Sequence, residues 1–495
     1  MSEIKADELY DRLVSYGMFS EKLPSIFTGD LFLNYCKNIC KQSFSDEWRG
    51  YINYESMRNT NIPRNIGIPT PMGHELLCKT LMKHWTKLTK YFETKTKGQP
   101  RIISRIHIRK IQDTKALFLM NYKNWIDDGT PEPDIYLGKR YMIHTDISKC
   151  YPSIYTHAIP WALVGKDVAK NNIGKYKEWY NQIDHFAQIS KNGETHGLLI
   201  GPHTSNILSE IILCAIDKEL SKKYDSYIRN IDDYICYVDT KEEADNFIID
   251  LNRELRKYDL LINHKKTEIY ELLICVIETW IHKIQNHMVT FQKFKDYIDY
   301  REIQAFIDFI IKLVSENTDN NSVVLYAVKA LKNFNLTKNA QEYLVKAIVS
   351  LSLLYPYLVP ILGQYIFEKY KVDPNQIQKY ANMIYEKYIQ KNNYEACSFA
   401  LLYAIDSNSK IDSIDVEIIK NSQDCILMLM AFIYCKKNNL KSEVKQLKLY
   451  AKELEKKGEI DQYWLFVYEC LGKLTGEWGT MKKNKVSFLK SEYRF

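Results

Sequence analysis

Three carboxylates at two places in the sequence are the residues best suited to chemistry. Asp146 follows the β-branched and aromatic run from Tyr141 to Thr145, so we expect it at the end of a strand. Asp232 and Asp233 are adjacent and lie between two apolar and aromatic runs, a pattern typical of a β-hairpin. If the fold brings the three together, their oxygens form a ligand set suited to Mg²⁺ rather than to zinc or copper.

A set of three carboxylates with two divalent ions is what two-metal phosphoryl transfer uses. One ion activates an attacking hydroxyl, and the other holds the triphosphate and the leaving oxygen. Each site also has a simpler interpretation, with Asp146 as a turn or helix-cap residue and Asp232-Asp233 as a solvated hairpin turn. In a strand, neighbouring side chains point to opposite faces, so only one of the adjacent pair can face the site squarely. The catalytic interpretation therefore predicts that Asp146 lies close to the pair.

Four motifs, in this order along the chain, resemble those of the reverse transcriptases. The segment from Asp146 to Tyr151 resembles their first palm motif, and Ile231-Asp232-Asp233 resembles their paired-aspartate hairpin. Between them, the segment from Gly197 to Asn206 is similar to the glycine-bounded loop and helix of the family. The segment from Leu260 to Glu268 then matches the fourth, lysine-bearing palm motif. A single motif would be weak evidence, but four in the family order are a specific match.

The resemblance implies roles for residues around the carboxylates. Asp146, Asp232 and Asp233 would be catalytic and would bind two Mg²⁺ ions, with Mn²⁺ as a substitute. Tyr151 stands where the family has an aromatic gate that excludes a ribose 2′-hydroxyl, which implies a DNA product. The implied metal ligands are Asp146, Ile147, Asp232 and Asp233, and the implied nucleotide-binding residues are Arg58, Arg64, Tyr151, Gly201, Ser205 and Lys266.

Within the family, the segment from Asp146 to Ala162 and the pair Gly201-Pro202 most resemble the abortive-infection polymerases, which are antiviral defence proteins of bacteria. Two positions depart from templated enzymes, because Ile200 stands where they usually carry glutamine and Asn230 where the hairpin often has tyrosine. The resemblance implies untemplated DNA synthesis that starts on a protein hydroxyl, so that single-stranded DNA stays attached, and it implies a homo-oligomer. Three tyrosines that we expect to be accessible are candidate priming residues: Tyr10, Tyr16 and Tyr35.

Two other functions remain open. The first is a templated reverse transcriptase that copies a dedicated non-coding RNA in a bacterial defence system. The second is a non-enzymatic helical scaffold with a decayed palm, and the presence of all three carboxylates argues against it.

Length and composition set broader limits. A chain of 495 residues exceeds what one hydrophobic core serves, so we expect at least two domains. The net charge of +7 favours a polyanionic partner, although many proteins are this basic. Eleven cysteines without a CxxC pair fit a reducing cytoplasm. No signal peptide is evident, and no run of about 18 apolar residues predicts a membrane span.

The predicted fold class is α+β, with reverse-transcriptase-like fingers and palm at residues 1–280 and an all-α, HEAT-like repeat domain at residues 281–495. Early in the first domain, the segment from Arg58 to Pro71 is rich in Pro and Gly and predicts an extended structure. The segment from Lys79 to Lys115 is strongly basic with interleaved aromatics, which suits a single-stranded nucleic acid. Seven apolar-periodic segments predict helices in the second domain: 303–314, 323–331, 341–354, 377–388, 396–405, 425–434 and 440–454.

Overall fold

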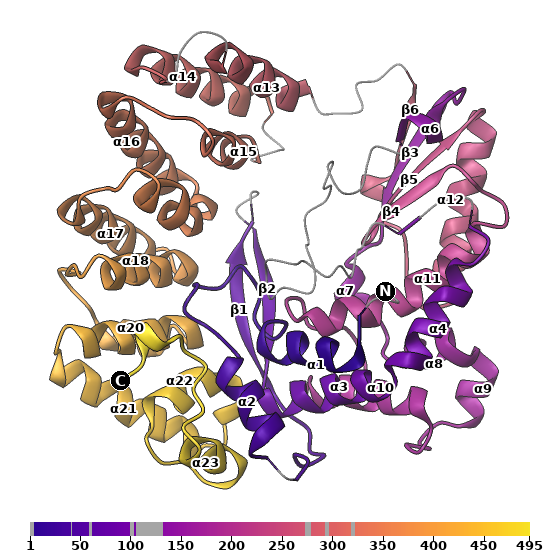
Figure 1. Cartoon of the computed structure of the whole chain (residues 1–495), viewed down its shortest axis with the longest axis horizontal. Helices are drawn as coiled ribbons and strands as arrows, with labels where there is room; N and C mark the ends of the chain where they lie inside the picture. The colour runs from indigo at the N-terminus through magenta and orange to yellow at the C-terminus, as the bar shows by residue number, and fades with distance from the viewer. Residues whose placement is uncertain are drawn as a thin grey trace.

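The computed structural model describes residues 4–40, 42–58, 62–99, 103–104, 132–272, 279–292, 297–317 and 322–495. A mixed α/β region comes first along the chain, and a helical region follows it and curves round in an arc (Figure 1). The elements of the first region are α1 (Ala6–Ser15), α2 (Asp30–Asn38), β1 (Tyr51–Met57), β2 (Pro63–Pro69), α3 (Pro71–Lys83), α4 (Trp85–Thr96), α6 (Glu132–Tyr136), β3 (Tyr141–Asp146), α7 (Cys150–Ser153), α8 (Ala158–Val164), α9 (Lys166–Asn171), α10 (Trp179–Ile189), α11 (His203–Leu220), β4 (Tyr227–Asn230), β5 (Asp233–Val238), α12 (Lys241–Arg256), the 3₁₀ turn His264–Lys266 and β6 (Glu268–Glu271).

A four-stranded antiparallel sheet, here called the palm sheet, carries the carboxylates. Its strand order is β4-β5-β3-β6. Helix α12 packs against β3 and β5, and α11 packs against α12. Almost every residue of α11 is buried, as expected for a helix that is apolar on nearly all sides. The sheet is therefore held on a packed helical layer, which gives its strand ends a fixed position.

Strands β1 and β2 form a separate antiparallel hairpin that lies between the palm sheet and the helical arc (Figure 1). Tyr51 pairs with Pro69 at its base, and Met57 pairs with Pro63 near its tip. The extended structure expected after Arg58 is confirmed for β2. Helix α3 then begins at Pro71, where the missing N–H of proline costs no helical hydrogen bond.

The second region is helical throughout its described residues, and each of the seven predicted helices has an observed counterpart. Short polar breaks between the apolar segments supply helix caps, since Asp299, Asp373, Asn393, Asp415 and Asp424 each accept a hydrogen bond from a backbone N–H in the first turn. The elements are α13 (Thr279–Gln292), α14 (Tyr300–Glu316), α15 (Ser322–Leu331), α16 (Lys338–Leu354), a 3₁₀ helix (Pro356–Ile361), a π-helix (Gly363–Glu368), α17 (Pro374–Ile389), α18 (Tyr394–Asp406), α19 (Val416–Asn421), α20 (Cys425–Lys437), α21 (Lys441–Lys456), η4 (Ile460–Tyr463), α22 (Trp464–Cys470), α23 (Gly476–Lys483) and η5 (Ser491–Tyr493).

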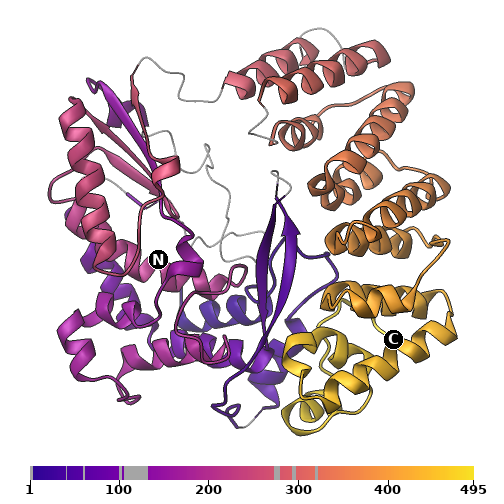
Figure 2. The ribbon, with the colours of Figure 1, turned by 180° about the vertical axis from the view of Figure 1, so that it is seen from behind.

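Neighbouring helices of the arc pack in succession, with α17 on α18, α18 on α20 and α20 on α22. From behind, the same helices again lie side by side along the arc (Figure 2). The HEAT-like repeat class and the domain boundary near residue 280 stay predictions. No helix among the described residues is long and apolar enough to cross a membrane.

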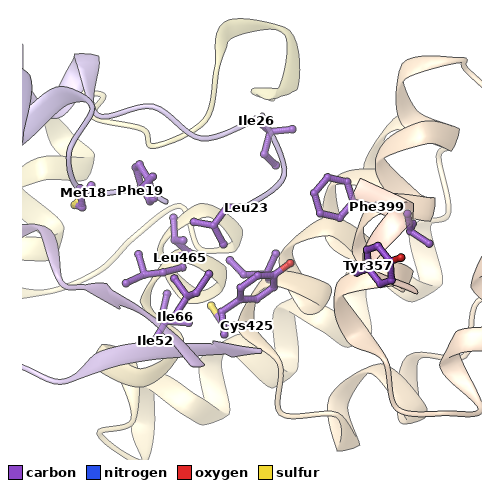
Figure 3. Packing of buried hydrophobic residues seen from close by; sticks show 14 of the residues in the cluster. Met18, Phe19, Leu23, Ile26, Ile52, Ile66, Tyr357, Phe399, Cys425 and Leu465 are labelled. Atoms are coloured by element: carbon purple, nitrogen blue, oxygen red, sulfur yellow. The ribbon is translucent and has the colours of Figure 1, made fainter. Parts of the chain in front are cut away.

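One hydrophobic core joins the two regions. Figure 3 shows Ile52 and Ile66 of the β1–β2 hairpin beside Cys425 and Leu465 of the helical arc. Polar contacts reinforce the joint, because the backbone N–H of Met57 donates to Glu395 Oε2 at 2.7 Å and that of Gly50 donates to Asp461 Oδ2 at 2.9 Å. A third contact is the ion pair between Arg49 Nη2 and Glu477 Oε2 at 2.6 Å. The hairpin is thus fixed to the helices that follow it by more than 300 residues in the chain.

Candidate active site

Strand pairing brings the three carboxylates together at one end of the palm sheet. Asp146 ends β3 and is the direct partner of Asp233, which begins β5. Directly paired residues of antiparallel strands have Cα atoms about 4.5–5.5 Å apart. Asp232 precedes Asp233 in the turn, and its carbonyl accepts a hydrogen bond from the N–H of Ile147 at 3.1 Å. The predicted convergence of Asp146 with the adjacent pair is therefore present in the backbone.

The turn that carries Asp232 has a demanding backbone conformation. Strands β4 and β5 are joined by the two residues Ile231 and Asp232, with Asn230 paired to Asp233. Ile231 has φ = 59°, which lies in the left-handed region. Two-residue hairpins favour a positive φ at their first central position, but a β-branched residue is rarely found there. Such a conformation costs about 1–3 kcal/mol, so neighbouring groups must hold it.

Arg229 stabilises the turn in this conformation. Its Nη1 donates to the carbonyl oxygen of Ile231 at 2.9 Å and to Glu210 Oε2 at 3.0 Å, and its Nη2 donates to Asp217 Oδ2 at 2.6 Å. The side chain of Arg229 is 0% exposed, and those of Glu210 and Asp217 are also buried. A guanidinium with two carboxylate partners in the interior fixes the turn from beneath.

The ion-paired cluster of Glu210, Asp217 and Arg229 was not among the residues singled out from the sequence. A signal for it exists, because Glu210 and Asp217 are seven residues apart and so share one face of an otherwise apolar helix. Two carboxylates on a buried helical face require a cation, and Arg229 is the basic residue two positions before the turn.

Lys266 lies against the first carboxylate, with its Nζ 2.6 Å from Asp146 Oδ2. The lysine comes from the 3₁₀ turn before β6, and the N–H of Asn263 in the same segment donates to the carbonyl oxygen of Asp146 at 2.7 Å. The hydrogen bond to Asp146 raises the pKa of Lys266, so the lysine is a cation here. It offsets part of the repulsion among the three carboxylates.

The donor set fits divalent cations in its chemistry. Burial, followed by the charges of Asp146 and Asp233, raises the pKa of Asp232 to about 7. Burial and the charge of Asp146 raise the pKa of Asp233 to about 6. A bound dication would relieve both effects, activating an attacking hydroxyl and holding a triphosphate. Within the described residues, however, no three His, Cys, Asp or Glu side chains are arranged to hold a metal ion.

Tyr151 lies on α7, five residues after Asp146 in the sequence. Its hydroxyl donates a hydrogen bond to Asn206 Oδ1 at 2.6 Å. The tyrosine is half-buried and Asn206 is buried, so the ring is tied to α11 rather than free to rotate. Tyr151 was expected at the site from the sequence, but no local pattern identifies Asn206 as its partner.

The glycine-bounded loop lies between the palm and the β1–β2 hairpin. Gly201 has φ = 127°, and a Cβ there would meet Ile66 Cγ2 at 2.9 Å, so both the conformation and the space require glycine. The carbonyl oxygen of Ile200 accepts a hydrogen bond from the N–H of Gly67 at 2.9 Å. Ser205 is buried in the first turn of α11, and its role as a nucleotide-binding residue stays a prediction.

The arginines expected to bind phosphate lie on the hairpin. Arg64 is exposed on β2 and pairs in register with Ser56, and Arg58 is exposed just beyond the end of β1. Their roles as nucleotide-binding residues stay predictions. Of the basic segment from Lys79 to Lys115, the part with Arg101, Arg105 and Arg109 lies outside the described residues.

The expectation of accessibility is wrong for two of the three tyrosines proposed for priming. Tyr10 is buried and donates to Glu75 Oε1 at 2.8 Å, and Tyr35 is buried, which raises its pKa to about 12. Both lie on amphipathic helices, where the ring faces the core. Tyr16 is 37% exposed. Its ring centroid is 6.2 Å from that of His203, the first residue of α11.

Comparison with known proteins gives one family match. Residues 77–295 match the family model described as reverse transcriptase (RNA-dependent DNA polymerase). A comparison with curated proteins finds no match.

Two solved structures are similar at a low level. Apo telomerase from Candida tropicalis has 13% identity and a TM-score of 0.31, over 77% of this chain and 68% of that one. Telomerase from Candida albicans, solved with a fragment of telomeric RNA, has 10% identity and a TM-score of 0.32, over 74% and 67%. These TM-scores are too low to carry an argument about fold or function. The family match, in contrast, covers Asp146, Asp232, Asp233 and Lys266, so this part of the chain is similar to a reverse transcriptase domain.

Proposed function

We propose that the protein is an antiviral-defence DNA polymerase that adds dNTPs without a template and starts synthesis on one of its own hydroxyl groups. The observation that carries the polymerase assignment is the pairing of Asp146 with Asp233 beside the turn that holds Asp232. The untemplated and protein-primed character rests on the resemblance stated from the sequence. Antiviral defence, a homo-oligomeric state and a cytoplasmic location are parts of the same proposal.

The proposed reaction is nucleotidyl transfer. An attacking oxygen forms a bond to the α-phosphorus of a dNTP, the bond from that phosphorus to the β-phosphate oxygen breaks, and pyrophosphate leaves. The proton of the attacking hydroxyl passes to solvent. Asp146, Asp232 and Asp233 would hold two Mg²⁺ ions for this step, and Lys266 would move from Asp146 to the phosphates.

Tyr16 is the priming residue that the geometry supports best among the three candidates. It is the exposed one, whereas Tyr10 and Tyr35 are buried. The carbonyl of its neighbour Gly17 accepts a hydrogen bond from the N–H of His203 at 2.8 Å, which places this segment against the start of α11. Burial and the charge of Glu21 raise the pKa of Tyr16, so its phenol must lose its proton during the attack rather than before it.

Intact-mass spectrometry of the purified chain tests the proposal. After incubation with each dNTP and Mg²⁺, without template, we expect a ladder of added nucleotide masses on the protein. Tyr16→Phe, which removes only the hydroxyl, should abolish the ladder, and Tyr10→Phe serves as the matched control. A ladder that persists in Tyr16→Phe would exclude this residue, and an absence of added mass in the unmodified protein would contradict protein priming.

The family match favours a second candidate, because its description is that of an RNA-dependent enzyme. In this alternative the protein copies a dedicated non-coding RNA. Sequencing the nucleic acid that copurifies with the chain separates the two functions. A defined cDNA with a matching RNA supports templated synthesis, whereas homopolymeric or random DNA supports the untemplated reaction.

A further inference from the structure

A groove lined by lysines lies between α20 and α21, in the helical arc. Its volume is about 560 Å³. Five of its nine lining residues are lysines and none is acidic; the nine are Cys435, Lys436, Asn439, Lys441, Val444, Lys445, Lys448, Leu449 and Lys452.

Four of these lysines form a stripe along α21. Lys441, Lys445, Lys448 and Lys452 are spaced by four, three and four residues, which places their side chains on one helical face. At a rise of 1.5 Å per residue, the stripe is about 16 Å long. The acidic residues of the same helix, Glu443, Glu453 and Glu455, do not line the groove.

The stripe is unfavourable for the isolated helix, because like charges three and four residues apart repel. Among the ion pairs of the described residues, none includes a lysine of the groove. A concave surface with one sign of charge concentrates counter-ions of the opposite sign. The groove is therefore suited to an anionic ligand with several charges in a row.

Apolar groups lie beside the lysines. Leu449, which lines the groove, is 49% exposed. Phe495 is 64% exposed, and its ring centroid is 5.4 Å from Nζ of Lys436. Exposed apolar and aromatic surface next to a row of cations is the combination that binds single-stranded nucleic acid, whose backbone follows the charge while its bases contact the apolar surface.

We propose that the α20–α21 groove is a binding site for a single-stranded polynucleotide, with Lys441, Lys445, Lys448 and Lys452 on its phosphates. The site is separate from the carboxylate site, since α20 and α21 lie at the end of the arc away from the palm sheet (Figures 1 and 2). The proposal does not depend on the polymerase function, and it applies equally to a DNA or an RNA strand.

Binding of a fluorescein-labelled 12-nucleotide oligo-dT to the full chain, followed by fluorescence anisotropy without Mg²⁺, tests the site. The variant K445Q/K448Q/K452Q keeps three good helix formers and removes three charges. The control K369Q/K379Q/K410Q removes three exposed charges from the same region outside the groove. Only the groove variant should bind roughly tenfold or more weakly, with a slope of log K against log salt reduced by about 2, since each phosphate contact contributes about 0.7. Equal losses in both variants, or no loss in either, would overturn the proposal.

Lysine acetylation followed by mass spectrometry locates the strand directly. We expect the oligonucleotide to protect Lys445, Lys448 and Lys452 but not Lys369 or Lys379. A polyglutamate of equal charge should not displace the strand at equal concentration, because it lacks bases for the apolar surface. Unprotected groove lysines, or equal displacement by polyglutamate, would show that the groove is not a polynucleotide site.

Discussion

Removal of the Arg229 guanidinium should separate the stability of the fold from the positioning of Asp232. In Arg229→Met, the carboxylates of Glu210 and Asp217 stay in the interior without their cation. Breaking a buried ion pair on one side costs about 3–5 kcal/mol in the free energy of unfolding. The carbonyl of Ile231 also loses its donor, which adds about 1–3 kcal/mol if it stays buried.

A triple replacement distinguishes the two effects. In R229M/E210M/D217L no buried charge remains, and exchanging a whole buried ion cluster for apolar residues is often neutral for stability. The turn, however, still lacks the contact that holds Ile231 at a positive φ. We therefore expect the free energy of unfolding to fall only by the roughly 1–3 kcal/mol of the lost donor to Ile231, without the cost of the broken ion pairs. If the same energy of about 1–3 kcal/mol is lost from the transition state, activity should fall about 5- to 150-fold.

Three measurements on the same preparations decide the outcome: urea denaturation, dNTP incorporation with Mg²⁺, and Tb³⁺ luminescence, which reports metal binding without turnover. Arg229→Lys serves as the conservative control, since it keeps the charge but cannot bridge Glu210, Asp217 and the carbonyl together. If the triple variant folds normally, binds Tb³⁺ and incorporates dNTPs like the unmodified protein, the argument that Arg229 positions the turn is wrong.

Three further perturbations test the site. Asp232→Asn should abolish dNTP incorporation with an unchanged circular dichroism spectrum, because an amide is a poor ligand for a second dication; residual activity above about 1% would be inconsistent with this role. Asn206→Leu should lower the preference for dNTP over rNTP several-fold by freeing Tyr151, measured as a ratio of kcat/KM values, and a preserved ratio would exclude the contact as a determinant. The Mg²⁺ concentration for half-maximal rate should fall as pH rises from about 6 to about 8, because the raised pKa values of Asp233 and Asp232 lie near 6 and 7 and metal competes with their protons. These pKa values are raised above unfolded values near 4, so the metal-free folded protein binds more protons than the unfolded chain between about pH 4 and pH 7. Its free energy of unfolding should therefore fall as the pH rises from about 4 to about 7. Urea denaturation in EDTA at several pH values checks the sign, and Asp232→Asn should show a shallower fall.

Local patterns predicted the strand that ends at Asp146, the hairpin at Asp232-Asp233 and the seven helices of the arc correctly. A β-branched run before Asp146 and aromatic residues after Asp233 are strong period-two signals, and they end at the residues that pair in the sheet. The seven helices of the arc followed from apolar periodicity for the same reason. Strands, hairpins and helices depend on residues that are close together in the chain, so their patterns can be read from the sequence.

Contacts between distant segments were not predictable in this way. The partnership of Arg229 with Glu210 and of Tyr151 with Asn206 depends on how α11 packs beneath the sheet. The prediction that Tyr10 is accessible was wrong for the same reason. Its hydroxyl donates a hydrogen bond in the interior to Glu75, which is 65 residues away in the chain. The docking of the β1–β2 hairpin on the helical arc likewise has no signal in either segment alone.

That docking determines which parts of the chain can move independently. A hairpin held at Met57, Gly50 and Arg49 by residues of the distant helices cannot swing on its own. If Arg64 is to approach or leave a triphosphate, the helices must move with the hairpin as one rigid unit. The hinge for such a motion must then lie outside the contact between the hairpin and the helices. A truncated protein that ends before the arc would expose Ile52 and Ile66 to water and would leave the hairpin without a support. The helices therefore support the β1–β2 hairpin, and a partner that restrains the helices would restrain the hairpin and Arg64 as well.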